Sequence, residues 1–112
     1  MRNKFFNTVK VLDQEYEIIE NSKECDKANA DGLCNYYNKK IYIRPEEEMF
    51  EGDAGVDDIS KENRYKEVMR HEIIHAFLDE CGEDDYSKDE RLVSFLAMQF
   101  YKLHDIFEKL DI

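Results

Sequence analysis

The spacing of apolar residues in this chain changes at its single proline, Pro45. Before Pro45 they form short runs rich in β-branched and aromatic residues, which are typical of strands. Beyond residue 59 they recur at helical spacing over two long segments. A length of 112 residues is that of one domain. The pattern predicts a single α+β domain over residues 1–112, in which a small antiparallel N-terminal sheet packs on one helix and a second helix follows.

Two hairpins are expected in the sheet, which would span about residues 4–45. The candidate strands are residues 8–12, 16–19, 32–36 and 40–44, with turns near 13–15 and 37–39. The polar segment Asn21–Asp31 has the composition of a loop. Pro45 cannot donate a hydrogen bond to a ladder, so it is expected to end the last strand. Residues 46–59 are acidic and are interpreted as a solvated connection with one helical turn after Pro45.

The two expected helices cover about residues 60–81 and 87–110. Ser60 is a plausible N-cap of the first helix, and Gly82 is suited to the position just beyond its end. The centre of this helix is apolar on most sides, which predicts that it is buried. The second helix carries one broad apolar stripe, made of Leu92, Val93, Leu96, Ala97, Phe100, Leu103, Phe107 and Leu110.

Charge and composition exclude several classes of function. The formal net charge of −11 would repel a phosphate backbone, so binding to nucleic acid without sequence preference is not expected. No apolar run approaches the length of a membrane span, and the first residues do not resemble a signal peptide. Three cysteines at irregular spacing suggest reduced thiols rather than a disulfide framework. A cytoplasmic location without membrane contact is the simplest interpretation.

The residues that carry chemistry are His71-Glu72-Ile73-Ile74-His75, an H-E-x-x-H motif inside the first predicted helix. Positions i and i+4 lie on one helix face, so both imidazoles can reach one ion, and neutral imidazole is a good zinc ligand. Glu72 lies about 100° further round the helix, beside the ligands, where it can serve as a general base. Ordinary helix residues would be the alternative, but polar groups in a buried stretch are costly without partners.

A third protein ligand is needed, since two histidines leave a catalytic zinc site incomplete. Position on the second helix favours Glu90, and Asp89 remains an alternative. Ser87–Glu90 also matches a capping box, in which the Glu90 side chain would bond back to the N-cap amide. His104 is about 21 Å further along the helix, too far to join Glu90 at one ion. The acids of the connecting segment are the remaining candidates: Glu83, Asp84 and Asp85.

The stretch from Arg70 to Leu78, with Gly82 and residues 89–97 after it, resembles the small zincin-like metallopeptidases of phages and mobile elements in Gram-positive bacteria. It is similar, more distantly, to the SprT-like and ImmA/IrrE-like groups. The resemblance covers about residues 30–103. It implies Glu90 as the third ligand of Zn²⁺ and a minimal zincin fold, in which the ligand lies on the helix after the active-site helix.

The function expected from the motif and the resemblance is hydrolysis of a peptide or protein substrate by zinc-bound water, with Glu72 as general base. A substrate strand could add to the edge of the sheet near Gly32–Tyr36. The candidates for a second donor to the developing oxyanion are three tyrosines: Tyr36, Tyr86 and Tyr101.

Two other functions fit the same motif. In one, the zinc is structural, with Cys34 or Cys81 in its fourth position, and the domain is a binding or regulatory module. In the other, the chain is a phage structural or assembly component with a vestigial site.

Overall fold

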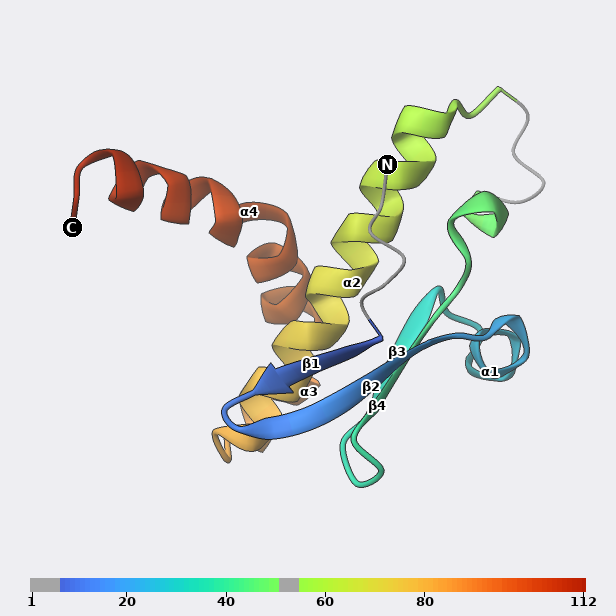
Figure 1. The fold of residues 1–112 in the computed structure, drawn as a ribbon, viewed down its shortest axis with the longest axis horizontal. Helices are drawn as coiled ribbons and strands as arrows, with labels where there is room; N and C mark the ends of the chain where they lie inside the picture. Colours follow the sequence, from blue (N-terminus) through green and yellow to red (C-terminus); the bar gives the residue numbers. More distant parts are fainter. Residues whose placement is uncertain (1–6, 51–54) are drawn as a thin grey trace.

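The computed structural model describes residues 7–50 and 55–112, and it confirms the α+β class (Figure 1). A four-stranded sheet comes from the first part of the chain, one long helix of the second part packs against it, and a second long helix packs on the first (Figure 1). The elements in chain order are β1 Thr8–Val11, β2 Gln14–Glu20, α1 Ser22–Ala28, β3 Gly32–Asn35, β4 Lys40–Ile43, the 3-10 helix η1 Glu46–Glu48, α2 Asp58–Glu80, α3 Asp84–Lys88 and α4 Glu90–Lys109.

The sheet is mixed, so the expectation of an entirely antiparallel sheet is wrong. Its strand order is β1-β2-β4-β3. The two hairpins β1–β2 and β3–β4 are antiparallel, as expected, whereas β2 and β4 run parallel, with Ile18 opposite Ile41. The parallel pair arises because α1 and β3 lie between these strands in the chain and carry it back to the start of β4. As a result, β3 is an outer strand of the sheet.

The first hairpin turns slightly earlier than the sequence suggested. Leu12 and Asp13 form the turn with φ angles of 49° and 69°, the signs that a tight two-residue hairpin turn requires. The second hairpin turns at residues 36–39, in agreement with the prediction, and Lys39 has a φ of 55°.

The segment Asn21–Asp31 contains the helix α1 instead of being a loop throughout. The side chain of Asn21 accepts a hydrogen bond from the backbone N–H of Glu24, and Asn29 ends the helix in the left-handed conformation. Cys25 is the buried residue of this short helix. The spacing of Asn21 and Glu24 is that of an N-terminal cap, a local signal that the polar composition obscured.

Helix α2 begins slightly before the predicted start. Asp57 is its N-cap and accepts from the backbone N–H of Ser60, so Ser60 is not the cap. Gly82, with φ of 78°, lies just beyond the end, as predicted. Along the centre of the helix, residues 68–78, every residue is buried or half-buried except Phe77, which is 46% exposed. The expected turn after Pro45 is η1, while residues 51–54 of the predicted connection lie outside the described residues.

The core lies between the sheet and α2. One cluster of buried side chains joins Val11, Tyr16 and Ile41 of the sheet to Ala76 of α2. A second cluster, formed by Ile43, Met49, Tyr65 and Val68, fills the space nearer the start of α2. Together they fix α2 across one face of the sheet and leave its remaining faces to α4 and a cleft.

Two predicted boundaries near the end of the chain are wrong. The connecting segment after Gly82 contains the short helix α3 and is not only a linker, and α4 begins at Glu90 and not at Ser87. The N-cap of α4 is Asp89, whose side chain accepts from the backbone N–H of Leu92. Within residues 7–50 and 55–112, none of the helices combines the length and apolar character needed to cross a bilayer.

Candidate metal centre

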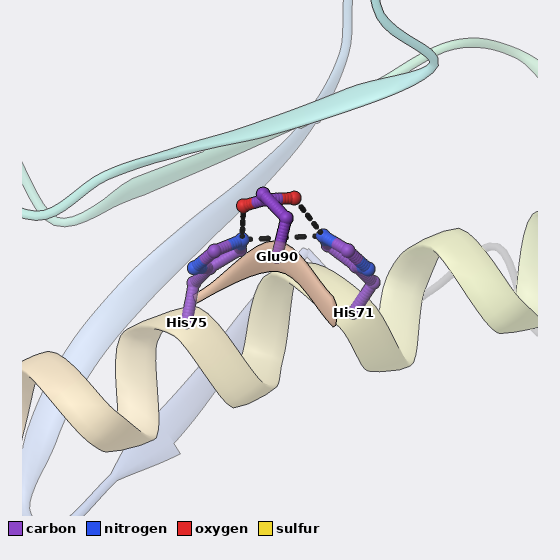
Figure 2. Close-up of side chains that lie close together, drawn as sticks. All are labelled: His71, His75 and Glu90. Carbon is purple, nitrogen blue, oxygen red and sulfur yellow. Dashed lines mark hydrogen bonds and ion pairs between the residues drawn. The ribbon is translucent and has the colours of Figure 1, made fainter. Parts of the chain in front are cut away.

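Helix α2 places two imidazoles side by side. His71 and His75 are one turn apart, and their Nε2 atoms are 3.2 Å from each other (Figure 2). Both side chains are partly buried, with exposed fractions of 19% and 15%. The two rings therefore present one nitrogen each to the same point in space, as the i, i+4 spacing predicted.

Glu90 reaches this point from the first turn of α4. Its carboxylate oxygens lie 3.1 Å from Nε2 of His71 and 2.8 Å from Nε2 of His75, so the carboxylate bridges the two rings (Figure 2). The three residues form a group whose ligand atoms all lie within 4.8 Å of one another. The structure thus brings together the three residues predicted as ligands.

The alternative acids are placed differently. The carboxylate of Asp89 caps α4, 3.1 Å from the backbone N–H of Leu92. His104 is exposed and pairs with Glu108 at 3.0 Å. The acids of the connecting segment, Glu83, Asp84 and Asp85, are exposed. Among the described residues, the cluster that could hold a metal includes none of these side chains.

Contacts between α2 and α4 set the position of Glu90. The Arg70 side chain donates through Nε to the backbone carbonyl of Ala97 at 2.7 Å, and its guanidinium lies 4.5 Å from the ring centre of Tyr101. Val93 and Ala97 are completely buried. Because these two side chains are small, the helices approach closely and bring the first turn of α4 to the histidines.

Ser87 orients one of the two imidazoles. This buried residue of α3 donates its hydroxyl proton to the backbone carbonyl of His75 at 3.3 Å. The same oxygen lies 3.3 Å from Nδ1 of His75, so it is placed to accept the Nδ1–H. A proton on Nδ1 leaves Nε2 as the nitrogen with a free lone pair, which is the nitrogen that faces His71 and Glu90.

The sequence does not indicate this role, because Ser87 begins a capping-box pattern that predicts it as the N-cap of the last helix. With Asp89 as the cap, the capping box is absent, and the Glu90 side chain is free to point toward the histidines. No local pattern marks Ser87, since its partner is twelve residues away on another helix. The small size of α3 and its buried serine become visible only in the fold.

The burial of His71 favours its neutral form. Its pKa is lowered, first by removal from water and then by the neighbouring His75, while Glu90 acts in the opposite direction. The neutral ring is the form that binds a metal. The surroundings of His71 therefore favour the ligating form at neutral pH.

Glu72 lies on the sheet side of the same helix, where it is 5% exposed. Burial raises its pKa to about 8, and the nearby charge of Glu90 adds to the shift. Gly32 at the start of β3 packs directly on it: a Cβ at position 32 would lie 2.6 Å from Cγ1 of Val68 and 3.1 Å from Cγ of Glu72. Glycine thus allows the outer strand to approach the helix at the residue expected to act as the base.

The residues converge on a cleft of about 680 Å³. Its walls include the two histidines, Glu72 and Glu90. The opposite wall contains five consecutive residues, 30–34. Alternate residues of a strand point to opposite faces, so a consecutive run indicates that β3 borders the cleft with its backbone edge. The lining of this cleft does not include the candidate oxyanion donors Tyr36, Tyr86 and Tyr101.

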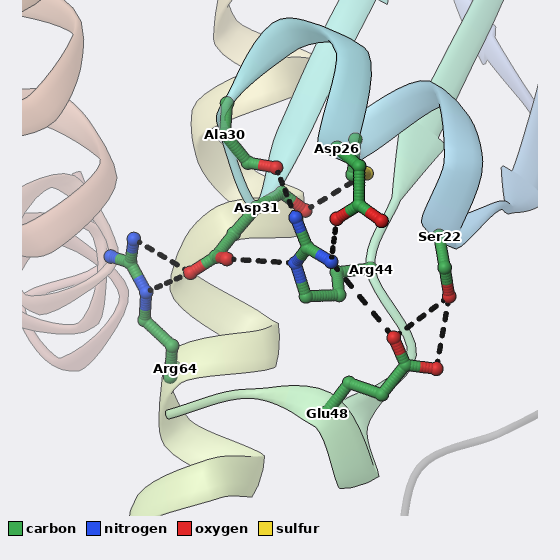
Figure 3. A network of polar contacts seen from close by, with 8 residues as sticks. Ser22, Asp26, Ala30, Asp31, Arg44, Glu48 and Arg64 are labelled. Atoms are coloured by element: carbon green, nitrogen blue, oxygen red, sulfur yellow. Dashed lines mark hydrogen bonds and ion pairs between the residues drawn. The ribbon is translucent and has the colours of Figure 1, made fainter. Parts of the chain in front are cut away.

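An ion-pair network anchors the outer strand beside the cleft (Figure 3). The carboxylate of Asp31, the residue before β3, lies 3.1 Å from Nε of Arg44 and 3.1 Å from Nε of Arg64 on α2. Arg44 also pairs with Asp26 at 2.8 Å and donates to the carbonyl of Ala30 at 3.1 Å. Asp31 therefore joins the ends of α1 and β4 to the helix that carries the histidines.

The donor set of two imidazole nitrogens and one carboxylate suits zinc and leaves room for a further ligand. Sulfur is not part of it. Cys34 lines the cleft, but its sulfur does not belong to the group of converging atoms, and Cys81 is exposed.

No protein-family model, curated protein or solved structure matches this chain. The chemistry of the site therefore has to be inferred from the arrangement of its residues.

Proposed function

We propose that the protein is a zinc-dependent metallopeptidase. The observation that supports this function best is the convergence of His71, His75 and Glu90 within 4.8 Å, with the buried carboxyl of Glu72 lining the same cleft. The resemblance to small zincin-like metallopeptidases points the same way and stays a prediction. Zinc at this position would supply a Lewis acid and a water molecule of lowered pKa.

The chain's own residues supply the remaining chemistry. Glu72 accepts a proton from the attacking water at a carboxylate oxygen and passes it to the nitrogen of the leaving amine. Its raised pKa favours the protonated form, and a divalent cation beside it favours the ionised form that a base requires. Ser87 holds His75 in the tautomer that presents Nε2, and Arg70 holds α4 so that Glu90 completes the site.

The proposed substrate is an extended peptide segment. The outer strand β3 borders the cleft, and its backbone groups are placed to pair with a peptide laid along it. Such pairing is independent of side-chain identity, so β3 would position the backbone of many sequences across from the three ligands. A reducing compartment such as the cytoplasm is part of the proposal, since Cys25, Cys34 and Cys81 are all unpaired.

Hydrolysis of an unstructured protein tests the proposal. The zinc-loaded protein is incubated with reduced, carboxymethylated casein, and new amino termini are quantified against time. The Glu72→Gln variant, which preserves side-chain volume, is the matched control and is analysed for bound zinc in the same preparation. Cleavage by the parent and none by a zinc-containing Glu72→Gln protein supports the proposal. A zinc-loaded parent with no cleavage, or equal cleavage by both proteins, would contradict it.

A further inference from the structure

The C-terminal half of α4 carries a large exposed apolar surface. The C-terminal half of the helix extends away from α2 and from the sheet (Figure 1), and every residue from 101 to 112 is exposed. Apolar side chains in this part that are about half exposed are Phe100 at 53%, Leu103 at 46%, Ile106 at 52%, Phe107 at 38% and Leu110 at 64%. A monomeric protein rarely presents so many neighbouring apolar side chains to water.

These side chains follow the spacing of a coiled-coil seam. Phe100, Leu103, Phe107 and Leu110 are separated by three, four and three residues, and the half-buried Leu96, four residues before Phe100, continues the repeat toward the start of the helix. A repeat of this kind places the side chains on one narrow stripe that packs against the equivalent stripe of another helix. A helix that only covered its own core would need no such regular seam beyond the last buried residue, Ala97.

Charge favours a second copy of the chain as the partner. The chain as a whole carries a formal net charge of −11, so most of its surface repels another copy. Helix α4 has three acidic residues, Glu90, Asp105 and Glu108, and three basic residues, Arg91, Lys102 and Lys109. The seam thus lies on an electrically balanced helix, where repulsion between copies is weaker than the net charge of the whole chain implies. The same balance offers no attraction to an anionic membrane surface.

The available area is that of a small dimer interface. A half-exposed side chain of phenylalanine or leucine offers roughly 100 Å². The four side chains of the seam and the neighbouring Ile106, on each of two copies, give an interface on the order of 1,000 Å² in total. This area is near the lower limit for a specific association. The expected dimer is therefore weak enough to dissociate on dilution.

We propose that the seam formed by Phe100, Leu103, Phe107 and Leu110 is a homodimer interface. An antiparallel arrangement about a two-fold axis places Phe100 opposite Leu110 of the second copy, and Leu103 opposite Phe107 of the second copy. Every layer then contains one large and one smaller side chain, a self-complementary packing. The seam begins ten residues after Glu90, about 15 Å along the helix, so the dimer is independent of the metal centre.

Sedimentation velocity over about 2–200 µM protein tests the proposal, since a weak association is half complete within such a range. The unmodified chain is expected to shift from monomer to dimer as its concentration rises. Phe100→Glu places two buried charges in the seam and is expected to weaken dimerisation at least tenfold. Phe95→Glu is the matched control, because Phe95 is 60% exposed on the same helix but lies outside the seam.

Circular dichroism establishes that each variant is folded, and Leu103→Glu replaces Phe100→Glu if the latter is not. A concentration-dependent dimer that is lost in a folded seam variant and retained in Phe95→Glu supports the proposal. A parent that stays monomeric throughout the range contradicts it. A dimer that persists in the folded seam variant also contradicts it. The same holds if Phe95→Glu weakens the dimer as much as the seam variant does. Flotation of the monomer with anionic phospholipid vesicles would instead assign the seam to a membrane surface and overturn the dimer.

Discussion

The hydroxyl oxygen of Ser87 lies 3.3 Å from Nδ1 of His75 and donates its own proton to the backbone carbonyl of the same histidine. One buried side chain is thus placed to favour the Nδ1-protonated tautomer of His75 and also links α3 to α2. The relationship connects the candidate metal centre to a helix of five residues that the sequence did not indicate. It also gives Ser87 a testable role beside the ligands.

Ser87→Ala is expected to lower zinc affinity about 10- to 100-fold, because the orienting hydrogen bond is lost while all three ligands remain. The measurement is competition against a chromophoric chelator at pH 7. Ser94→Ala is the control, since Ser94 also lines the cleft but has no part in the ligand group. Equal affinities for the two variants would show that the hydrogen bond does not orient the ligand.

Neutral substitutions at Glu90 and at Asp89 distinguish which of the two residues is the third ligand, because the two substitutions are expected to affect zinc binding very differently. Glu90→Gln is expected to weaken zinc binding by at least 100-fold, since an amide is a poor substitute for the carboxylate ligand. Asp89→Asn is expected to leave affinity within about threefold, because asparagine also caps a helix well. Isothermal titration of the metal-free proteins provides the comparison. If Asp89→Asn loses more zinc affinity than Glu90→Gln, then Asp89 and not Glu90 is the third ligand.

Gly32→Ala is expected to destabilise the protein by about 1–3 kcal/mol, since the new methyl group would lie 2.6 Å from Cγ1 of Val68. Urea unfolding measures the change. Val68→Ala alone is also expected to be destabilising, because it leaves a cavity. The Gly32→Ala/Val68→Ala double variant should lose less free energy of unfolding than the sum of the losses in the two single variants, because Val68→Ala makes room for the new methyl group. Strict additivity would mean that β3 does not press on α2 at this point.

The stability of the metal-free protein should fall as pH rises between about 4.5 and 8. The pKa of Glu72 is raised from its ordinary 4.5 to about 8, so the folded chain binds more protons than the unfolded chain in this interval. The stabilising contribution is complete below the unfolded pKa and is lost as pH rises through the folded pKa.

The Glu72→Gln variant has no such proton to lose. With a chelator present, it should be more stable than the parent by about 4 kcal/mol at pH 8, and the difference should nearly vanish by pH 4.5. Glu67→Gln, on the same helix and lining the same cleft, is the control. The same pH profile for parent and Glu72→Gln would rule out Glu72 as the group responsible.

Local patterns in the sequence predicted much of this molecule. The i, i+4 spacing of His71 and His75, the glycine at 82 and the β-branched runs each act through neighbouring residues, and the structure agrees with all of them. Tyr16 shows how the strands gain further support, since this completely buried residue donates to Glu80 at the end of α2.

Features that depend on distant partners were missed. The parallel pairing of β2 with β4 is set by the path of α1, and Arg44 stabilises that path through Asp26 and Asp31. The role of Ser87 depends on α3 meeting α2. Likewise, the apolar stripe of α4 was predicted from its period, but the period alone does not show that the stripe extends beyond the core.

The most direct test of the metal centre is X-ray absorption at the zinc edge of protein loaded with one equivalent of zinc. Our interpretation predicts a first shell of nitrogen and oxygen only, with multiple-scattering features of two imidazoles and about two oxygen neighbours. One oxygen would come from Glu90 and one from solvent. A sulfur neighbour, or the signal of fewer than two imidazoles, would contradict the assignment of His71, His75 and Glu90 and with it the proposed enzyme.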